Sequence, residues 1–193
     1  MPSDSDSFNW LPPDSLAATQ RLLGCELERE LGGQVLRVRI VETEAYDQSD
    51  PASHSFRGHT PRTSVMFGPA GHLYVYFTYG MHYCCNIVVG PAGHGAAVLL
   101  RAAEPLEGEL TMAGLRPGAR GVNLTNGPAK LCQALAITRE LNGQDLAVPP
   151  LRLIQRPALE PAAITQTTRI GIKHATDRPW RLYITDNPYI SRR

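Results

Sequence analysis

Acidic side chains are missing from a long central part of the sequence. No Asp or Glu occurs between Asp50 and Glu104, although the 193-residue chain has 18 acidic and 19 basic residues. The same interval holds five of the six histidines, together with Arg57, Arg62 and Arg101, and the aromatic run YVYFTYGMHY. A span without acids and rich in aromatic rings suits a negatively charged ligand that carries a base.

Other features are scarce as well. Lysine occurs only at Lys130 and Lys173, so arginine supplies nearly all the positive charge, which suits phosphate binding but also follows from a GC-rich genome. The net charge is only +1, so any nucleic-acid interpretation must rest on local patches. No CxxC spacing and no run of 18 apolar residues occurs. We therefore expect reduced cysteines, no metal or other cofactor, no membrane contact and a cytoplasmic protein.

The length fits one domain with a proper core. We assign residues 1–12 to a flexible N-terminal arm and residues 13–193 to the single domain, and we expect a mobile, arginine-ended tail. Asp14 is a candidate N-cap for a short helix that ends at Gly24. Candidate strands late in the chain include residues 168–172.

A two-residue turn at Gly32-Gly33 predicts a hairpin whose second strand is Gln34–Tyr46. Alternation places Leu36, Val38 and Ile40 on one face, and counting on by twos adds Glu42, Glu44 and Tyr46 to that face. Carboxylates at the end of a core face would reach the rim of a pocket. The alternative is that the strand ends or bulges near Val41 and that the glutamates face water.

Several sequence blocks resemble one known family: RIVETEAY, DPASHS, TPRTSVMFGPAGHLYVYFTYGMHYCCN, AVLLRAAEPLEG and NGPAKLCQALAI. These blocks are similar to those of the alkyladenine (3-methyladenine, N-methylpurine) DNA glycosylases, in the same order from Leu22 to Leu146. The similarity continues more weakly through RIGIKHA and RPWRLYI. The absence of a long N-terminal extension fits a compact bacterial-type member, whose location would be the cytoplasm, associated with the nucleoid.

The resemblance implies both a fold and a reaction. The family fold is a mixed α/β (α+β) single domain around a curved, mostly antiparallel β-sheet, with flanking helices and a β-hairpin that enters the minor groove. The family flips a damaged, alkylated or deaminated purine out of duplex DNA and hydrolyses its N-glycosidic bond with water. It leaves an abasic site and uses neither a metal nor a lysine Schiff base.

The resemblance also assigns roles to particular residues. Glu44 matches the general base that activates water, and Arg101 matches the arginine that helps to hold that water. A carboxylate suits this chemistry because it can deprotonate water and stabilise an oxocarbenium-like sugar. Glu42 is the rival carboxylate, and alternation alone does not separate the two glutamates.

Four further residues match the family's base pocket: Tyr46, His54 and Tyr76 match rings that stack on the flipped base, and Asn86 matches the side chain that rejects guanine. Without the resemblance, the tyrosines would be read as core aromatics, while His54 and Asn86 would be read as residues that bond to backbone. The lesion range, and any general acid for neutral lesions, are left open by the sequence.

The hairpin tip and the cations complete the expected DNA contacts. Tyr79 matches the wedge that fills the gap left by the flipped nucleotide, with Met81 beside it. Arg62, Lys130 and Arg57 would contact phosphates. The expected partner is double-stranded DNA with damaged purines, bound by a monomer. The alternatives are a non-catalytic damage-binding module on the same scaffold and a metal-dependent hydrolase, although the histidines show no zinc-ligand spacing.

Overall fold

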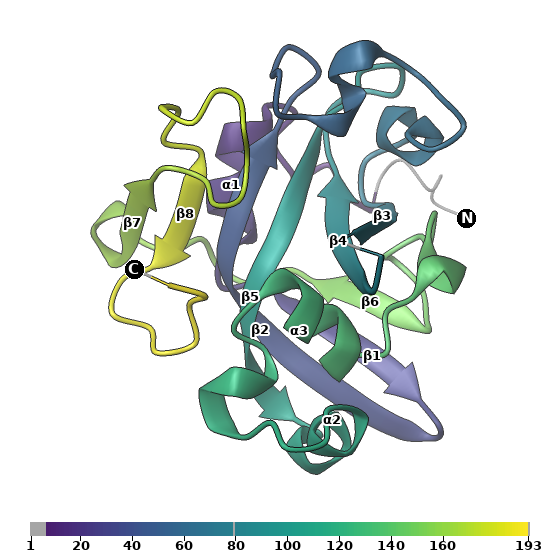
Figure 1. Cartoon of the computed structure of the whole chain (residues 1–193), viewed down its shortest axis with the longest axis vertical. Coiled ribbons are helices and arrows are strands. Elements are labelled where there is room, and N and C mark those ends of the chain that lie inside the picture. The colour runs from purple at the N-terminus through teal and green to yellow at the C-terminus, as the bar shows by residue number, and fades with distance from the viewer. Residues whose placement is uncertain (1–6, 79, 193) are drawn as a thin grey trace.

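The computed structural model of the chain describes residues 7–78 and 80–192. It shows a twisted, curved antiparallel sheet with helices packed against it (Figure 1). Over these residues the strands are β1 Glu26–Leu31, β2 Gln34–Tyr46, β3 Leu73–Thr78, β4 His82–Val88, β5 Ala97–Glu107, β6 Leu151–Ile154, β7 Ile164–Thr167 and β8 Arg181–Ile184. The expected mixed α/β (α+β) fold is confirmed.

Strand β2 is the centre of the sheet. The strand order is β3-β4-β5-β2-β1-β6, with β8 paired to β2 and β7 paired to β8. One edge of β2 pairs with β5, whereas the other edge pairs with β1 over residues 34–39 and with β8 over residues 42–44. The part of β2 that carries the two glutamates is therefore hydrogen-bonded along both edges and shielded from water.

Three α-helices occur in the described chain: α1 Ser15–Leu22, α2 Glu109–Leu115 and α3 Pro128–Ala134. The side chain of Asp14 accepts a hydrogen bond from the Ala17 amide, as expected of an N-cap. The largest core cluster joins α1 and α3 to one face of the sheet, with Leu22, Ile40, Leu100 and Leu131 among its buried members.

The expected alternation along β2 is wrong beyond Ile40, because the strand bulges. Ile40 pairs with Ala103 and Thr43 pairs with Leu100, and the Ile40, Ala103 and Leu100 side chains belong to the large core. Side chains on one face of a regular strand are an even number of residues apart, but Ile40 and Thr43 are three apart. The bulge therefore moves the even-numbered side chains after Ile40 to the other face of the sheet. Glu42 and Glu44 consequently lie on the opposite face from Leu36, Val38 and Ile40. They do not face water either, since both are fully buried.

Two segments expected to be mobile are packed where the structure describes them. Phe8 and Leu11, within the predicted flexible arm of residues 1–12, are 7% exposed and belong to the large core cluster. Burial removes these two apolar side chains from water, which makes the packed position lower in free energy than an exposed arm. At the other end, Ile190 packs against Val41 and Ala102, so the predicted mobility of the tail is wrong for residues 190–192.

Two loops approach the end of β2: the long loop that follows β2 and the loop between β7 and β8. The long loop after β2 contains two 3-10 helices, His54–Arg57 and Ser64–Phe67. Residues 168–172, predicted to be a strand, instead form the beginning of the β7–β8 loop, which arcs beside the end of β2 in Figure 1. Residues 164–167 are the ones that pair with β8, so residues 168–172 belong to the loop and not to a strand.

Docking of the N-terminal segment depends on Gly71. This glycine has a φ of +83°, and a Cβ at this position would lie 2.0 Å from the Phe8 ring. We expect Gly71→Ala to lower the free energy of unfolding by about 2–5 kcal/mol, because left-handed strain adds to overpacking. Urea denaturation measures the loss.

A matched control separates the two causes. Gly33→Ala carries the same backbone strain at a φ of +77° but meets nothing within 4 Å, so it should cost only about 1–2 kcal/mol. In a Phe8→Ala background, the loss in free energy of unfolding caused by Gly71→Ala should fall to the loss caused by Gly33→Ala. An undiminished cost in that background would show that Phe8 does not rest on Gly71.

Candidate active site

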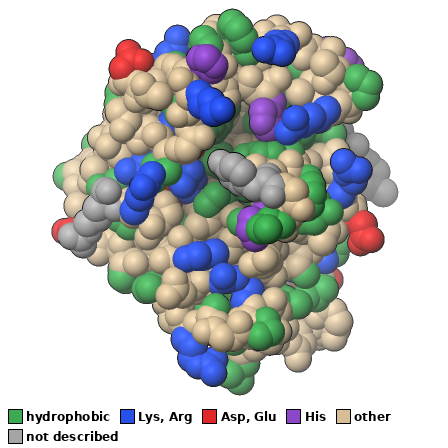
Figure 2. Space-filling model, in the orientation of Figure 1, with side chains coloured by type: hydrophobic (Ala, Val, Ile, Leu, Met, Phe, Trp, Pro, Cys, Tyr) green, Lys and Arg blue, Asp and Glu red, His purple; other side chains and the backbone are tan. Residues whose placement is uncertain are grey.

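A pocket of about 500 Å³ opens on the sheet face opposite the large core. Strands β2, β3, β4 and β5 supply Tyr46, Tyr76, Asn86 and Arg101 to its lining. His54 closes it from the loop after β2, and residues 170–174 close it from the β7–β8 loop. In Figure 2 the molecule is hollowed near the centre of the view, with Lys, Arg and His side chains around the hollow.

The Glu44 carboxylate lies buried beneath this pocket, and its partners line the pocket wall. Its Oε1 accepts a hydrogen bond from the Ile170 amide at 2.9 Å and lies 3.3 Å from Nη1 of Arg101. Its Oε2 accepts from the Tyr46 hydroxyl at 2.8 Å. Burial raises the pKa of Glu44 above its ordinary value, while Arg101, the Ile170 amide and the Tyr46 hydroxyl act against that rise.

Glu42 is buried as deeply as Glu44 but is fully engaged by structural partners. Its Oε1 accepts from Nη1 of Arg181 at 2.7 Å and from the Ser191 hydroxyl at 2.9 Å, and its Oε2 accepts from the Ser191 amide at 2.6 Å. Nε of Arg101 lies 3.6 Å from Oε1. Neither glutamate lines the pocket, but the hydrogen-bond partners of Glu44 do and those of Glu42 do not, so the geometry separates two carboxylates that alternation did not distinguish.

Aromatic rings form one side of the pocket. The His54 ring stands edge-on to Tyr76, with ring centroids 4.6 Å apart, and its Nδ1 lies 3.1 Å from the hydroxyl of the buried Tyr74. Although His54 is partly exposed at the open mouth, the surrounding protein and the nearby Arg62 lower its pKa to about 4. The imidazole is therefore neutral at physiological pH.

Asn86 bonds to backbone and also lies in the pocket lining. Its side-chain amide donates to the Tyr74 carbonyl at 3.3 Å, and the residue also lines the pocket. The backbone contact fixes the orientation of the amide, because it holds the NH₂ group toward β3. The side chain is 5% exposed, so it presents a fixed shape to whatever enters.

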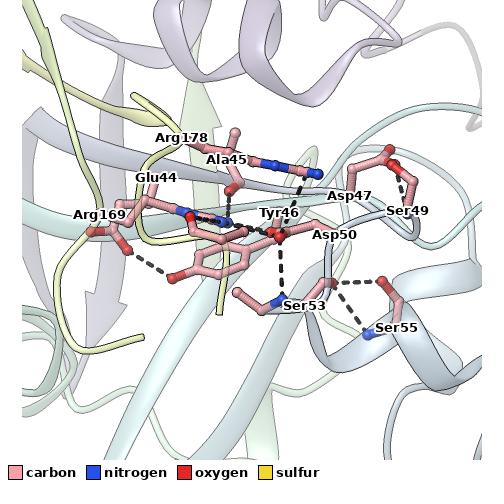
Figure 3. A network of polar contacts seen from close by, with 12 residues as sticks. Glu44, Ala45, Tyr46, Asp47, Ser49, Asp50, Ser53, Ser55, Arg169 and Arg178 are labelled. Carbon is pink, nitrogen blue, oxygen red and sulfur yellow. Dashed lines mark hydrogen bonds and ion pairs between the residues drawn. The ribbon is translucent and has the colours of Figure 1, made fainter. Parts of the chain in front are cut away.

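A buried ion pair ties the β7–β8 loop to the end of β2 (Figure 3). The Arg169 guanidinium hydrogen-bonds to both oxygens of Asp50, and its Nη1 donates to the Ala45 carbonyl at 2.9 Å. The guanidinium carbon also lies 4.7 Å from the centre of the Tyr46 ring. Arg169 thus fixes the backbone immediately before Ile170, whose amide binds Glu44.

Four of the remaining predicted site residues are not among the residues that line the pocket: Arg62, Lys130, Arg57 and Met81. Arg62 is near the Tyr74 and His54 rings. Lys130 is in the first turn of α3, where it donates to the side chains of Asn123 and Asn126. Arg57 is exposed at the end of its 3-10 helix. Met81 is 68% exposed in the β3–β4 turn, and Tyr79 lies outside the described residues.

Sequence reasoning missed four side chains that hold the site: Asp50, Arg169, Arg181 and Ser191. No local pattern marks them, because their partners are about 120–150 positions away in the chain. The one available signal was Asp50 itself, the last acid before the long acid-free interval. A buried acid at that point requires a cation from elsewhere.

Comparison with known proteins places the chain in a family. Residues 9–188 match the family model of methylpurine-DNA glycosylase (MPG). The chain belongs to the methylpurine-DNA glycosylase family. The match includes every strand of the sheet and every pocket residue named above.

Relatives of this methylpurine-DNA glycosylase family member come from distant organisms. A protein of Carboxydothermus hydrogenoformans is 50% identical over 93% of this chain and 95% of its own length. Proteins of Methanoculleus marisnigri and Agrobacterium fabrum are each 49% identical over 93% of this chain, and over 95% and 89% of their own lengths. All three bear the name "Putative 3-methyladenine DNA glycosylase".

Two further findings concern the described part of this glycosylase-family chain. Across residues 7–78 and 80–192, no helix is long and apolar enough to cross a membrane. In the same ranges, no three or more His, Cys, Asp or Glu side chains are grouped so that they could hold a metal ion.

The contacts of Glu42 predict a large effect of Arg181 on stability. Arg181→Met removes the nearer cation, at 2.7 Å, and leaves the buried carboxylate only Arg101 at 3.6 Å, so we expect a loss of about 3–5 kcal/mol in the free energy of unfolding. Arg39→Met is the control, because Arg39 pairs with Glu104 at a partly exposed site and should cost at most about 1 kcal/mol. Equal losses in urea denaturation would contradict the structural role given to Arg181.

Proposed function

We propose that the protein is a monofunctional DNA glycosylase of base excision repair that releases 3-methyladenine and related damaged purines from duplex DNA. Membership of the methylpurine-DNA glycosylase family and the names of the relatives support this function. Water is the nucleophile in the proposed reaction, and the DNA product is an abasic site. We further propose a cytoplasmic monomer that uses no cofactor.

The observation that carries the proposal is the environment of Glu44. A carboxylate buried beneath an aromatic pocket, and held by an arginine, an amide and a hydroxyl, is suited to act as a general base. Its raised pKa increases its proton affinity, while Arg101 keeps the ionised form accessible. In the proposed reaction Glu44 accepts a proton from water, and its charge stabilises the oxocarbenium-like sugar.

The pocket suits a flipped purine. Tyr46, Tyr76 and His54 offer aromatic surface, and a cationic alkylpurine gains cation–π attraction there beyond ordinary stacking. A neutral His54 adds no charge repulsion against such a base. The fixed Asn86 amide is placed to reject the exocyclic amine of guanine, and so to exclude an abundant normal base.

DNA would approach across the face shown in Figure 2, where Lys and Arg side chains surround the hollow and acidic groups lie toward the edges of the view. We propose that Arg62, Lys130 and Arg57 contact phosphates. We propose that Tyr79 and Met81 at the β3–β4 turn wedge between base steps, since Met81 and Phe77 expose apolar surface there. Such a wedge offsets the cost of unstacking the flipped nucleotide.

The alternative of a non-catalytic damage-binding module is not favoured. Binding alone would not require a buried carboxylate below the pocket floor together with an arginine that contacts it. Each of these charges costs free energy to bury, and a base-binding pocket could be built from apolar side chains instead.

Glu44→Gln tests the catalytic role directly. The amide cannot accept the proton of the attacking water, so we expect single-turnover base release from a duplex with 3-methyladenine or hypoxanthine to fall by at least about 10²-fold. Binding to the damaged duplex should persist. A smaller loss would argue against Glu44 as the base, and wild-type binding without release would favour the binding module.

The pH dependence of excision should report on the same carboxylate. Glu44 must be ionised to act, so kcat/KM on a cationic lesion should rise with pH through a pKa above the ordinary 4.5. Tyr46→Phe keeps the ring but removes the hydroxyl that donates to the ionised carboxylate, so the acid limb should move to higher pH. If the acid limb does not move, or moves to lower pH, the Tyr46 hydroxyl does not stabilise the ionised form of Glu44.

A further inference from the structure

The Tyr46 ring is contacted by the Arg169 guanidinium from outside the pocket. Tyr46 lines the cavity, whereas Arg169 does not and its side chain is fully buried. The guanidinium carbon lies 4.7 Å from the ring centroid, within the range of a cation–π contact. A base stacked on Tyr46 would therefore share the ring with a cation that is already in place.

The charge of Arg169 is not cancelled by its surroundings. Asp50 is its buried counter-ion, but Nη1 of Arg178 also approaches Asp50, at 3.7 Å. Two guanidinium groups thus share one carboxylate, and this cluster carries a net positive charge beside Tyr46 (Figure 3). Nε of Arg169 has no hydrogen-bond partner within the described residues, and besides Asp50 the guanidinium donates only to the neutral carbonyls of Ala45 and Ala175 there.

A cation on an aromatic ring changes what the ring can bind next. It draws the negative π charge toward itself, so a second cation at the ring is attracted less strongly than it would be by a free tyrosine. A neutral base depends mainly on apolar contact and stacking, which the first cation affects much less. The ring therefore discriminates between lesions by their charge.

We propose that Arg169 is a specificity-determining and positioning residue that limits the preference of the Tyr46 pocket for cationic alkylpurines over neutral damaged purines. The inference rests on the proposed glycosylase function, and it adds a determinant of lesion choice outside the pocket wall. Arg169 touches no substrate and acts through Tyr46. It also acts through the backbone at Ile170, whose amide binds Glu44 at 2.9 Å.

The test removes the buried charge pair without leaving a lone charge. Asp50→Asn combined with Arg169→Gln leaves the overall net charge unchanged and retains polar groups that can bond to the Ala45 carbonyl and the Ala52 amide. Asp50→Leu with Arg169→Met is the second variant, because apolar side chains of similar volume commonly replace a buried ion pair without loss of stability.

Release of 3-methyladenine from methylated DNA, whose lesion nucleotide is cationic, is compared with release of ethenoadenine, which is neutral. Single-turnover kcat/KM is measured for both. We expect either double variant to raise the ratio of cationic to neutral excision by about 3- to 10-fold relative to wild type. A merely structural role would lower both rates together and leave the ratio unchanged.

Arg178→Met is the matched control. Arg178 reaches the same Asp50 and stacks on Trp180 at 4.7 Å, but it makes no contact with the Tyr46 ring. The Arg178→Met variant removes a positive charge from the cluster without removing the cation at the ring, so its excision ratio should rise less than that of either double variant.

The outcomes separate this inference from the function on which it rests. Wild type that releases neither base would overturn the proposed glycosylase activity itself. Wild type that releases both, with an unchanged ratio in both folded double variants, would overturn the role of Arg169 alone. An equal rise in the Arg178→Met control would also overturn it, since the effect would then be one of general charge.

Discussion

Burial of two carboxylates in a strand paired along both edges is the constraint on which the site depends. Glu42 and Glu44 lie where β2 is held by β5 and β8 together, so neither can turn toward water. Each must be matched by a cation or by hydrogen-bond donors, because an unpaired buried charge costs several kcal/mol. Arg101, Arg181, Ser191 and the Ile170 amide supply these partners.

The two glutamates receive different kinds of partner, and this difference supports the different roles proposed for them. Arg181 and Ser191 hydrogen-bond Glu42 and do not line the pocket, so Glu42 anchors the tail, and Arg101 at 3.6 Å is its one ion-pair partner in the pocket wall among the described residues. Glu44 is bound by three groups that all line the pocket. One carboxylate therefore stabilises the scaffold, while the other is poised beneath the place where a substrate would bind. The strand bulge at residues 40–43 makes the arrangement possible, because it turns both side chains away from the aliphatic core.

Local patterns predicted the elements that carry the site better than they predicted its assembly. The Gly32-Gly33 turn and the Asp14 cap follow from turn and capping chemistry that acts over a few residues. The face of Glu44 was not predictable by counting, since a single extra residue in a strand reverses parity. Arg169, Arg181 and Ser191 were missed because their partners lie far away in sequence, and only the tertiary fold brings them together. The roles of Glu44, Arg101 and the pocket rings stay proposals drawn from resemblance and geometry.

The contact between Glu42 and Ser191 also has a consequence for synthesis in the cell. These residues are 149 positions apart, so at about 5–20 residues per second β2 leaves the ribosome roughly 7 to 30 s before its last partner. Arg101 emerges well before the end of that interval, but Glu42 lacks both Arg181 and Ser191 for most of it, so its hydrogen bonds stay unmade. Proteolytic removal of the segment that carries Ser191 would return Glu42 in the folded protein toward the same unsatisfied state.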